Sequence, residues 1–285
     1  MDSSQKLTNT DVKKLNKNRI FRLIYNSDKI SRQEIADQLG LSLPTVNQNL
    51  KMLMEDGLIE YVGNFTSTGG RRAQAITIDN NARKAISVNI KADYINVDVV
   101  GLKGQIIYSM AVKAHFSKSR AYIEKLTDAV RHAVDYVGAD ADDILGVGVT
   151  VPGILDDEKQ ILISAPPLKA KNYDFTRLIS AIDYPVVVMN DARAEAYADH
   201  WFNGKPEDEK IYIMLGEGVG GAYINASAIR NGVHNRGGEF GHMVIHPGGK
   251  QCLCGKKGCF EAYVSEKVLS SELDMTLDNF FELAA

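Results

Sequence analysis

The three cysteines of this chain are crowded into one short segment, at Cys252, Cys254 and Cys259, and His242 precedes them. A disulfide framework normally uses an even number of cysteines spread along the chain. One imidazole and three thiolates instead form the tetrahedral ligand set that zinc favours in closed structural sites. Because four protein ligands leave no open position, the pattern predicts a structural Zn²⁺ and not a catalytic one. The alternative is three reduced cysteines and an unrelated histidine.

Four polar side chains lie next to this segment or at the end of an apolar run. Asn190 and Asp191 close the run YPVVVM, Glu239 lies three residues before the histidine, and Glu261 lies two residues after the last cysteine. A bound metal would fix the loops that carry Glu239 and Glu261. A few polar groups of this kind can orient a small ligand in a pocket. Each of them alone can also be a surface ion pair or a helix cap, as Asp191 can be for the residues that follow it.

The hydrophobic pattern from residue 84 onward predicts an α/β fold that would position these side chains. Strands that end in polar or glycine loops are the usual way in which α/β domains build ligand sites. The expected order is strands over 85–112, an amphipathic helix over 120–137, a buried strand over 144–155, a strand over 184–190, a helix over 191–203, and a strand, glycine turn and strand over 210–224.

The first eighty residues predict a winged helix-turn-helix. Asn9 or Thr10 can cap a first helix, and the sequence from Ser31 to Glu34 is a capping box for a second. Gly40 can end that helix in the left-handed conformation that other residues resist. Ser42 can then cap a third helix. Its apolar stripe is Leu43, Val46, Leu50 and Leu53.

The third helix has the side chains of a recognition helix that reads DNA. With the apolar stripe inward, Pro44, Thr45, Gln48 and Lys51 point outward and Asn47 lies on the flank. Gln can pair with adenine through two hydrogen bonds.

Two strands follow this helix, LIEYVG and QAITI, and they flank a turn with Arg71 and Arg72 near its tip. Those arginines would form a wing that contacts phosphate or a narrow minor groove. A capped three-helix bundle with solvated polar residues is the alternative, and the Gly turn, the S-x-P-T-V start and the Arg-tipped hairpin together favour DNA binding.

Composition sets the broad class. The chain has 285 residues, enough for about two domains by the usual length prior. Residues 1–80 carry 11 Lys and Arg against 9 Asp and Glu, although the whole chain has a net charge of −3. There is no run of apolar residues long enough to cross a membrane, and the N-terminus lacks the apolar core of a signal peptide. We therefore expect a cytoplasmic protein without a membrane partner.

Five motifs follow one another in the second half of the chain: GVGVTVPGILDD, VMNDARAEAYADHWF, MLGEGVGGAYI, NRGGEFGHMVIHPGG and CLCGKKGCFEAYVS. In this order they resemble the ROK family of sugar kinases and sugar-responsive repressors, which have an actin-like ATPase fold. The resemblance covers about residues 84–270, and the cysteine segment with its upstream histidine is its strongest single match. With a winged helix in front, the architecture is similar to the repressor branch of the family, including the xylose and N-acetylglucosamine repressors.

The resemblance implies that Asn190, Asp191, Glu239 and Glu261 contact a sugar, and that His242 does so while also binding the metal. Asp191 occupies the position of the general base in ROK kinases. Family members continue beyond Ala285, so the chain resembles a C-terminally short member. We place the boundary between a DNA-binding domain, 1–80, and a sugar-binding domain, 81–285.

Two phosphate-binding loops of the kinases are altered, so we expect neither ATP binding nor kinase activity. The kinases carry D-x-G-G-T where this chain has Asn89 to Asp93 without a glycine, and side chains there would block the approach of backbone N–H groups to phosphate. The second loop, Gly216 to Gly221, keeps its glycines but has Glu217 in place of Thr, which would repel phosphate.

The resulting hypothesis is a sugar-responsive repressor that binds operator DNA as a homodimer or higher homo-oligomer. The first alternative is a ROK sugar kinase with an accessory DNA-binding domain. The second is a regulator that answers to a partner protein instead of a sugar.

Overall fold

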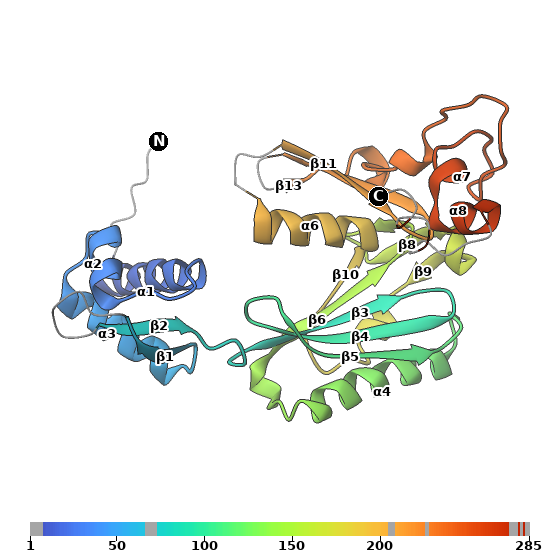
Figure 1. The fold of residues 1–285 in the computed structure, drawn as a ribbon. Coiled ribbons are helices and arrows are strands. Elements are labelled where there is room, and N and C mark those ends of the chain that lie inside the picture. Colours follow the sequence, from blue (N-terminus) through green and yellow to red (C-terminus); the bar gives the residue numbers. More distant parts are fainter. Residues whose placement is uncertain are drawn as a thin grey trace. The chain divides into compact units, whose positions relative to one another are not determined.

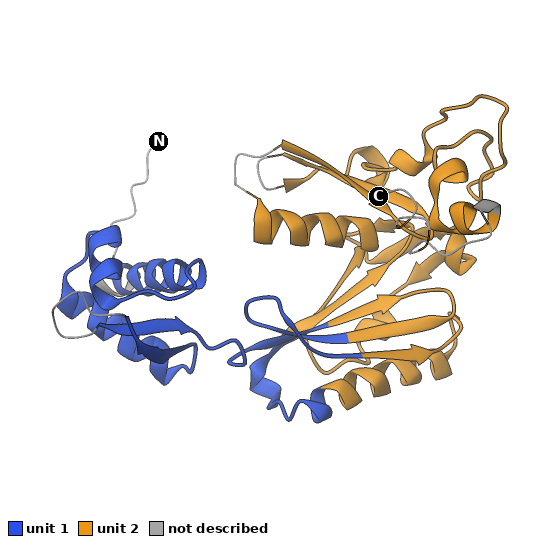
Figure 2. Ribbon diagram, in the orientation of Figure 1, with its two compact units in different colours: residues 1–86, 98–109, 134–145 blue, residues 87–97, 110–133, 146–285 orange. Residues whose placement is uncertain are grey.

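The computed structural model describes residues 8–65, 73–204, 209–225, 228–273, 279 and 282. Residue contacts divide the chain into two compact units, shown in Figure 2. Unit 1 combines Met1–Ile86, Asp98–Ser109 and Val134–Leu145, and unit 2 contains the remaining residues. No helix in the described part of the chain is long and apolar enough to cross a membrane.

A winged helix-turn-helix forms the first part of unit 1. The order of its elements agrees with the prediction (Figure 1): α1 Asn9–Tyr25, α2 Arg32–Leu39, α3 Leu43–Glu55, β1 Ile59–Asn64 and β2 Gln74–Ile78. The two strands pair antiparallel. Arg71 and Arg72, the predicted wing tip, lie outside the described residues.

Local capping signals set the ends of these helices. The Ser31 hydroxyl accepts from the Glu34 N–H while the Glu34 carboxylate accepts from the Ser31 N–H, and Gly40 ends α2 with φ of 63°. Thr8, and not Asn9 or Thr10, caps α1, because Asp11 completes a second capping box with it.

The core of the winged helix is made of apolar side chains from all five elements. Val46, Leu50 and Leu53 are buried as predicted, but the prediction for Leu43 is wrong, since it is 41 % exposed. Leu43 is the first residue of α3, in the turn that has not yet entered the bundle. Asn49 is buried instead and donates to the Thr45 carbonyl.

The second part of the chain has the predicted α/β elements. Its largest sheet has the strand order β10-β6-β3-β4-β5, with β10 parallel to β6. The bounds of its strands are β3 Lys84–Ile90, β4 Tyr94–Gly101, β5 Ile106–Lys113, β6 Ile144–Val151 and β10 Val186–Asn190.

Two three-stranded sheets and several helices complete the described fold. The sheets have the orders β7-β8-β9 and β11-β12-β13. Helix α6 begins where β10 ends, so its first turn lies at the carboxyl end of a parallel strand pair. The bounds are β7 Ile154–Asp156, β8 Ile161–Ala165, β9 Ala170–Asp174, β11 Glu209–Leu215, β12 Val219–Asn225, β13 Ala228–Ile229, α4 Arg120–Tyr136, α5 Thr176–Ile179, α6 Asp191–Asn203, α7 Glu261–Val264 and α8 Glu266–Leu273, with 3₁₀ turns η1 Ala141–Asp143, η2 Pro166–Leu168, η3 Val233–Asn235 and η4 Phe240–His242.

Candidate metal centre and ligand site

The four predicted metal ligands lie together. His242, Cys252, Cys254 and Cys259 each offer one atom, and these atoms all lie within 4.8 Å of one another. The Cys254 and Cys259 sulfurs are 3.7 Å apart, as are the Cys252 sulfur and His242 Nδ1. With Zn–S bonds of about 2.3 Å, two sulfurs of a tetrahedral site lie about 3.8 Å apart. The cluster therefore fits a tetrahedral zinc ion in both donor type and spacing.

Backbone turns bring the cysteines to the cluster. The Cys252 N–H donates to the Lys256 carbonyl, which closes a tight loop around Cys254. Gly258 has φ of 81°, and a Cβ there would lie 1.7 Å from the His246 carbonyl oxygen, so only glycine fits next to Cys259.

Burial and hydrogen bonding separate the proton affinities of the three thiols. Burial raises the pKa of Cys252 to about 12 and raises that of Cys259. Burial acts in the same direction on Cys254, but hydrogen bonds from the Lys256 N–H and the other two thiols outweigh it and lower its pKa. Because metals bind thiolates, an ion that binds here must displace protons, and its affinity depends on pH.

The Glu261 carboxylate and the turn that follows Glu239 both pack on Val219, the first residue of β12. The Glu261 carboxylate accepts from the Val219 N–H at 2.9 Å. Gly241 packs on the same residue, because a Cβ on it would lie 2.1 Å from the Val219 carbonyl oxygen. Gly241 lies between Glu239 and His242 in the sequence, and Nε2 of His242 lies 3.8 Å from the Glu239 carboxylate. The metal cluster and both carboxylates thus share one small region.

Asp191 lies at the start of α6, which packs on the same strand through Ala192. A Cβ on Gly220 would lie 2.6 Å from the Cβ of Ala192, so the start of α6 packs directly on β12. The buried Asp191 carboxylate accepts from the Ala192 N–H at 2.9 Å and from the Asn190 amide at 3.2 Å. Its other oxygen lies 3.8 Å from the Lys91 ammonium. Sequence reasoning treated Lys91 only as an obstacle to phosphate and missed this ion pair.

Asn190 caps α6, a role that the sequence analysis offered only as an alternative for its neighbour Asp191. Its Oδ1 accepts from the Arg193 N–H, so Asn190 and not Asp191 caps α6. Its amide also donates to the Gly153 carbonyl at 2.9 Å. These bonds occupy both polar atoms of the side chain and fix the loop between β6 and β7.

The turn between β3 and β4 occupies the place of the first phosphate loop. The Lys91 N–H donates to the Tyr94 carbonyl, which makes the turn tight. The Tyr94 hydroxyl donates to Glu217 in the glycine loop at 3.4 Å. Burial raises the pKa of Tyr94, and the negative charge of Glu217 raises it further. One end of the turn is therefore paired with Asp191 and the other with Glu217.

The predicted DNA-reading side chains of α3 face solvent. Pro44, Asn47, Gln48 and Lys51 are exposed, and Thr45 is partly buried. Lys51 lies 3.7 Å from Glu55, its neighbour one helical turn on. Except for Thr45, the predicted DNA-reading side chains of α3 therefore point to solvent and do not pack in the core of the winged helix.

Comparison with known proteins identifies both parts of the chain. Residues 15–60 match the winged helix-turn-helix DNA-binding family, and residues 85–281 match the ROK family. This chain belongs to the ROK family. The xylose repressor of Bacillus subtilis (strain 168) is 30 % identical over 268 residues, which are 93 % of this chain and 69 % of that protein. The transcriptional dual regulator NagC of Escherichia coli (strain K12) is 26 % identical over 92 % of this chain and 65 % of its own.

Solved structures of ROK proteins show the same fold. A ROK family transcriptional regulator, a homologue of the E. coli MLC protein, superposes with a TM-score of 0.67 at 24 % identity, over 92 % of this chain and 67 % of that one. A ROK glucokinase from Streptomyces griseus, solved with glucose and AMPPNP, has a TM-score of 0.57 at 31 % identity, over 66 % of this chain and 59 % of that one. The predicted fold class, a winged helix followed by an actin-like ROK domain, is confirmed.

The same comparisons decide between the two leading hypotheses. The xylose repressor and the DNA-binding transcriptional dual regulator NagC match 93 % and 92 % of this chain, whereas the glucokinase covers 66 % of it. The prediction of a sugar-responsive DNA-binding transcription regulator is confirmed over that of a kinase.

Proposed function

We propose that this ROK regulator binds an uncharged sugar through Asp191, Glu239 and Glu261, and that sugar binding changes the affinity of its winged helix for operator DNA. The observation that supports the site is that the Glu261 carboxylate, the start of α6 next to Asp191 and the turn after Glu239 all pack on the first residues of β12. Asn190 and His242 complete the proposed set. The boundary near residue 80, between a DNA-binding and a sugar-binding domain, belongs to the same proposal.

The charges around the site favour a neutral ligand. Asp191, Glu239 and Glu261 are acidic, and the ammonium of Lys91 is already paired with Asp191. A phosphate group would meet like charges here, which costs free energy in a partly buried site. A free pentose or hexose offers hydroxyls that donate to carboxylates. The name of the B. subtilis relative, xylose repressor, makes D-xylose the first sugar to test.

The metal in this proposal is a structural Zn²⁺. His242 and the three cysteines would hold it, and the ion would supply no chemistry beyond fixing the segment that carries Glu239 and Glu261. His242 places Nδ1 toward the cysteines and Nε2 toward Glu239, so it can bind the ion with one nitrogen while the other faces the proposed sugar site.

In the winged helix, the predicted DNA-reading residues of α3 would contact base edges, and the wing arginines would contact phosphate or the minor groove. The residues are Pro44, Thr45, Asn47, Gln48, Lys51, Arg71 and Arg72. Winged helices of this kind act on paired half-sites, so we propose a cytoplasmic homodimer or higher homo-oligomer. Coupling between sugar binding and operator affinity requires two arrangements of the protein that differ in DNA affinity, one of which binds the sugar more tightly than the other.

Capture of fragmented genomic DNA by the purified protein tests the proposal. The assay is run without sugar and with D-xylose, D-glucose and N-acetyl-D-glucosamine separately, for the wild type and for Asp191→Ala and Asp183→Ala. Asp183 is an exposed aspartate that precedes β10, at the opposite end of this strand from Asp191, and it serves as the matched control. We expect a discrete site whose occupancy changes with one sugar in the wild type and Asp183→Ala but not in Asp191→Ala. Occupancy that no sugar changes would contradict a sugar-binding role and favour a protein partner.

A further inference from the structure

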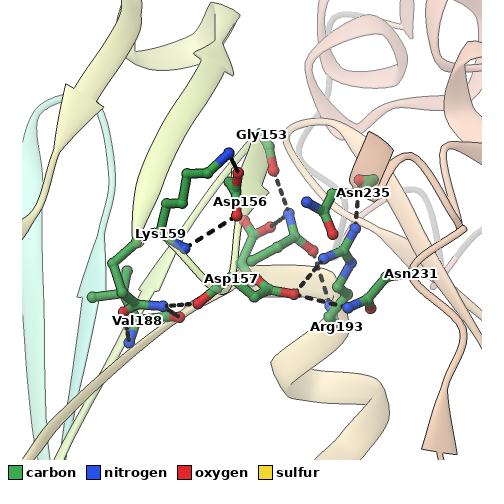
Figure 3. A network of polar contacts seen from close by, with 11 residues as sticks. Gly153, Asp156, Asp157, Lys159, Val188, Arg193, Asn231 and Asn235 are labelled. Carbon is green, nitrogen blue, oxygen red and sulfur yellow. Dashed lines mark hydrogen bonds and ion pairs between the residues drawn. The ribbon is translucent and has the colours of Figure 1, made fainter. Parts of the chain in front are cut away.

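A buried arginine joins three segments around the first turn of α6. The Arg193 side chain is only 5 % exposed. Its guanidinium donates to the Asp157 carboxylate at 3.0 Å and to the Asn235 carbonyl at 2.5 Å (Figure 3). Asp157 belongs to the turn between β7 and β8, and Asn235 to the loop that precedes Glu239. The planar fork of arginine can serve two acceptors at once, which a lysine cannot do in the same way.

The loop held by Arg193 contains strained backbone. His234 and Asn235 both have left-handed conformations, with φ of 63° and 57°. Residues other than glycine rarely adopt such angles, and consecutive ones persist only where their surroundings hold them. The Gly237 N–H donates to the Asn231 carbonyl and closes this loop on itself.

Asp157 is the shared partner of the loop and the arginine. The same oxygen that accepts from Arg193 also accepts from the Asn231 amide at 2.9 Å. Its other oxygen is buried without a hydrogen-bond partner. Burial raises the pKa of Asp157, although the charge of Arg193 acts in the opposite direction. A buried ion pair of this kind is weak evidence for stability. Its contribution here is to fix the loop against α6.

The position of this network connects it to the ligand site. Arg193 follows Asp191 by two residues, and the loop runs directly into Glu239. At the end of the loop, a Cβ on Gly238 would lie 2.1 Å from the Gly221 carbonyl oxygen, so the loop also packs on β12.

We propose that Arg193 is a positioning residue of the sugar site: it holds the strained loop 231–238 against α6 and so keeps Glu239 at a fixed distance from Asp191. The effect on sugar rests on the proposed function, whereas the effect on the loop does not. Without Arg193 the loop relaxes toward ordinary backbone angles, and the distance between Glu239 and Asp191 changes. Because the loss arises from backbone strain, glycine at position 235 should offset it.

The first measurement is amide hydrogen exchange without any ligand, on the wild type, Arg193→Met, Arg193→Lys, Asn235→Gly and Arg193→Met/Asn235→Gly. The matched control is Arg83→Met, which removes the half-buried ion pair with Asp143 in unit 1. We expect Arg193→Met to speed exchange in 231–238 at least tenfold and to leave β3 unchanged, and Arg193→Lys to have a smaller effect. Exchange in 231–238 equal to that of the wild type would overturn the proposal.

The second measurement is the affinity for D-xylose by calorimetry. We expect about tenfold weaker binding in Arg193→Met, which is ~1.4 kcal/mol, a partial recovery in the double variant, and no change in Arg83→Met. Equal losses in the single and double variants would show that Arg193 does not act through loop strain. If Arg193→Met does not fold, the D-xylose affinity of Arg193→Lys is compared with that of the wild type instead. If the wild type binds none of the three sugars, the proposed function fails, while the exchange experiment still decides the role of Arg193.

Discussion

The winged helix and the zinc segment, Phe240–Val264, both hold a short piece of chain in one conformation, but by different means. The winged helix buries eleven apolar residues from α1, α2, α3, β1 and β2 and the loop between α1 and α2 in one cluster. The zinc segment has a cluster of only three buried residues, Cys252, Cys259 and Ala262. Apolar residues of the same segment, Met243, Val244, Ile245 and Leu253, are between 47 % and 70 % exposed.

This difference shows where the stability of each region originates. Apolar burial contributes roughly 25 cal/mol per Å² and stabilises the winged helix without help. Three buried residues cannot offset the conformational entropy of the zinc segment. A metal that links four side chains of this segment can do so, because its binding free energy becomes folding free energy. The two regions should therefore respond to opposite perturbations.

Metal removal should have the largest effect. Structural zinc sites contribute about 10–16 kcal/mol in peptides at neutral pH, so Cys259→Ser or chelation should open the zinc segment. Because that segment carries Glu261 and directly follows Glu239, sugar binding should be lost as well. Hydrogen exchange should increase throughout 240–264 and stay at the wild-type level in α1, α2 and α3.

Metal content measured by mass spectrometry accompanies this experiment. We expect one zinc per chain in the wild type and less than one in the variant. A segment that keeps its protection without metal would show that the small core suffices, and the contrast between the two regions would fail.

A core truncation in α3 is the reverse experiment, with a smaller effect. Leu53 is 1 % exposed, so Leu53→Ala should cost the winged helix about 2–5 kcal/mol. Operator binding should weaken while zinc content and sugar affinity stay unchanged. Met54→Ala, at a neighbouring position that is 38 % exposed, is the control and should be nearly neutral. Loss of zinc in Leu53→Ala would mean that the two regions do not fold independently.

The two regions also differ in how much of them the sequence predicts. In the winged helix the decisive signals are local: Ser31 with Glu34, Gly40 and Ser42 fix helix ends within a few residues of themselves. The error at Leu43 has the same origin, because a helical stripe does not reveal where the helix enters the bundle. The four metal ligands are likewise predictable, since their types and spacing match the coordination chemistry of zinc.

The ligand site is less predictable because it depends on pairs distant in the sequence. The strand ends that carry Asn190 and Asp191 follow from the hydrophobic pattern, but the partner of Asp191 is Lys91, which lies in another strand connection. The role of Arg193 also stays hidden, since a helical arginine in a sequence is usually solvated. Its place two residues after Asp191 is the one signal that could have singled it out.

The smallest expected effect concerns pH and the first helix. The hydroxyl and backbone N–H of Thr8 donate to the Asp11 carboxylate and lower the pKa of that carboxyl below its ordinary value of 3.8. A depressed pKa means that this contribution to stability is present above pH 3.8 and is lost as the pH falls through the folded-state pKa. Thr8→Ala should bring the pKa of Asp11 back toward 3.8, as measured from its carboxyl carbon by NMR titration.

The exposed Asp174, at the end of β9, is the control, because hydrogen bonds from Thr176 lower the pKa of its carboxyl and do not involve Thr8, so this pKa should not change. The same variant should exchange amides faster at the start of α1 and leave the zinc segment unchanged. An Asp11 pKa that does not move would show that the capping box does not form in solution. In that case the stability of α1 would rest on apolar burial alone. The winged helix and the zinc segment would then differ only in that a hydrophobic core stabilises the first and a metal ion the second.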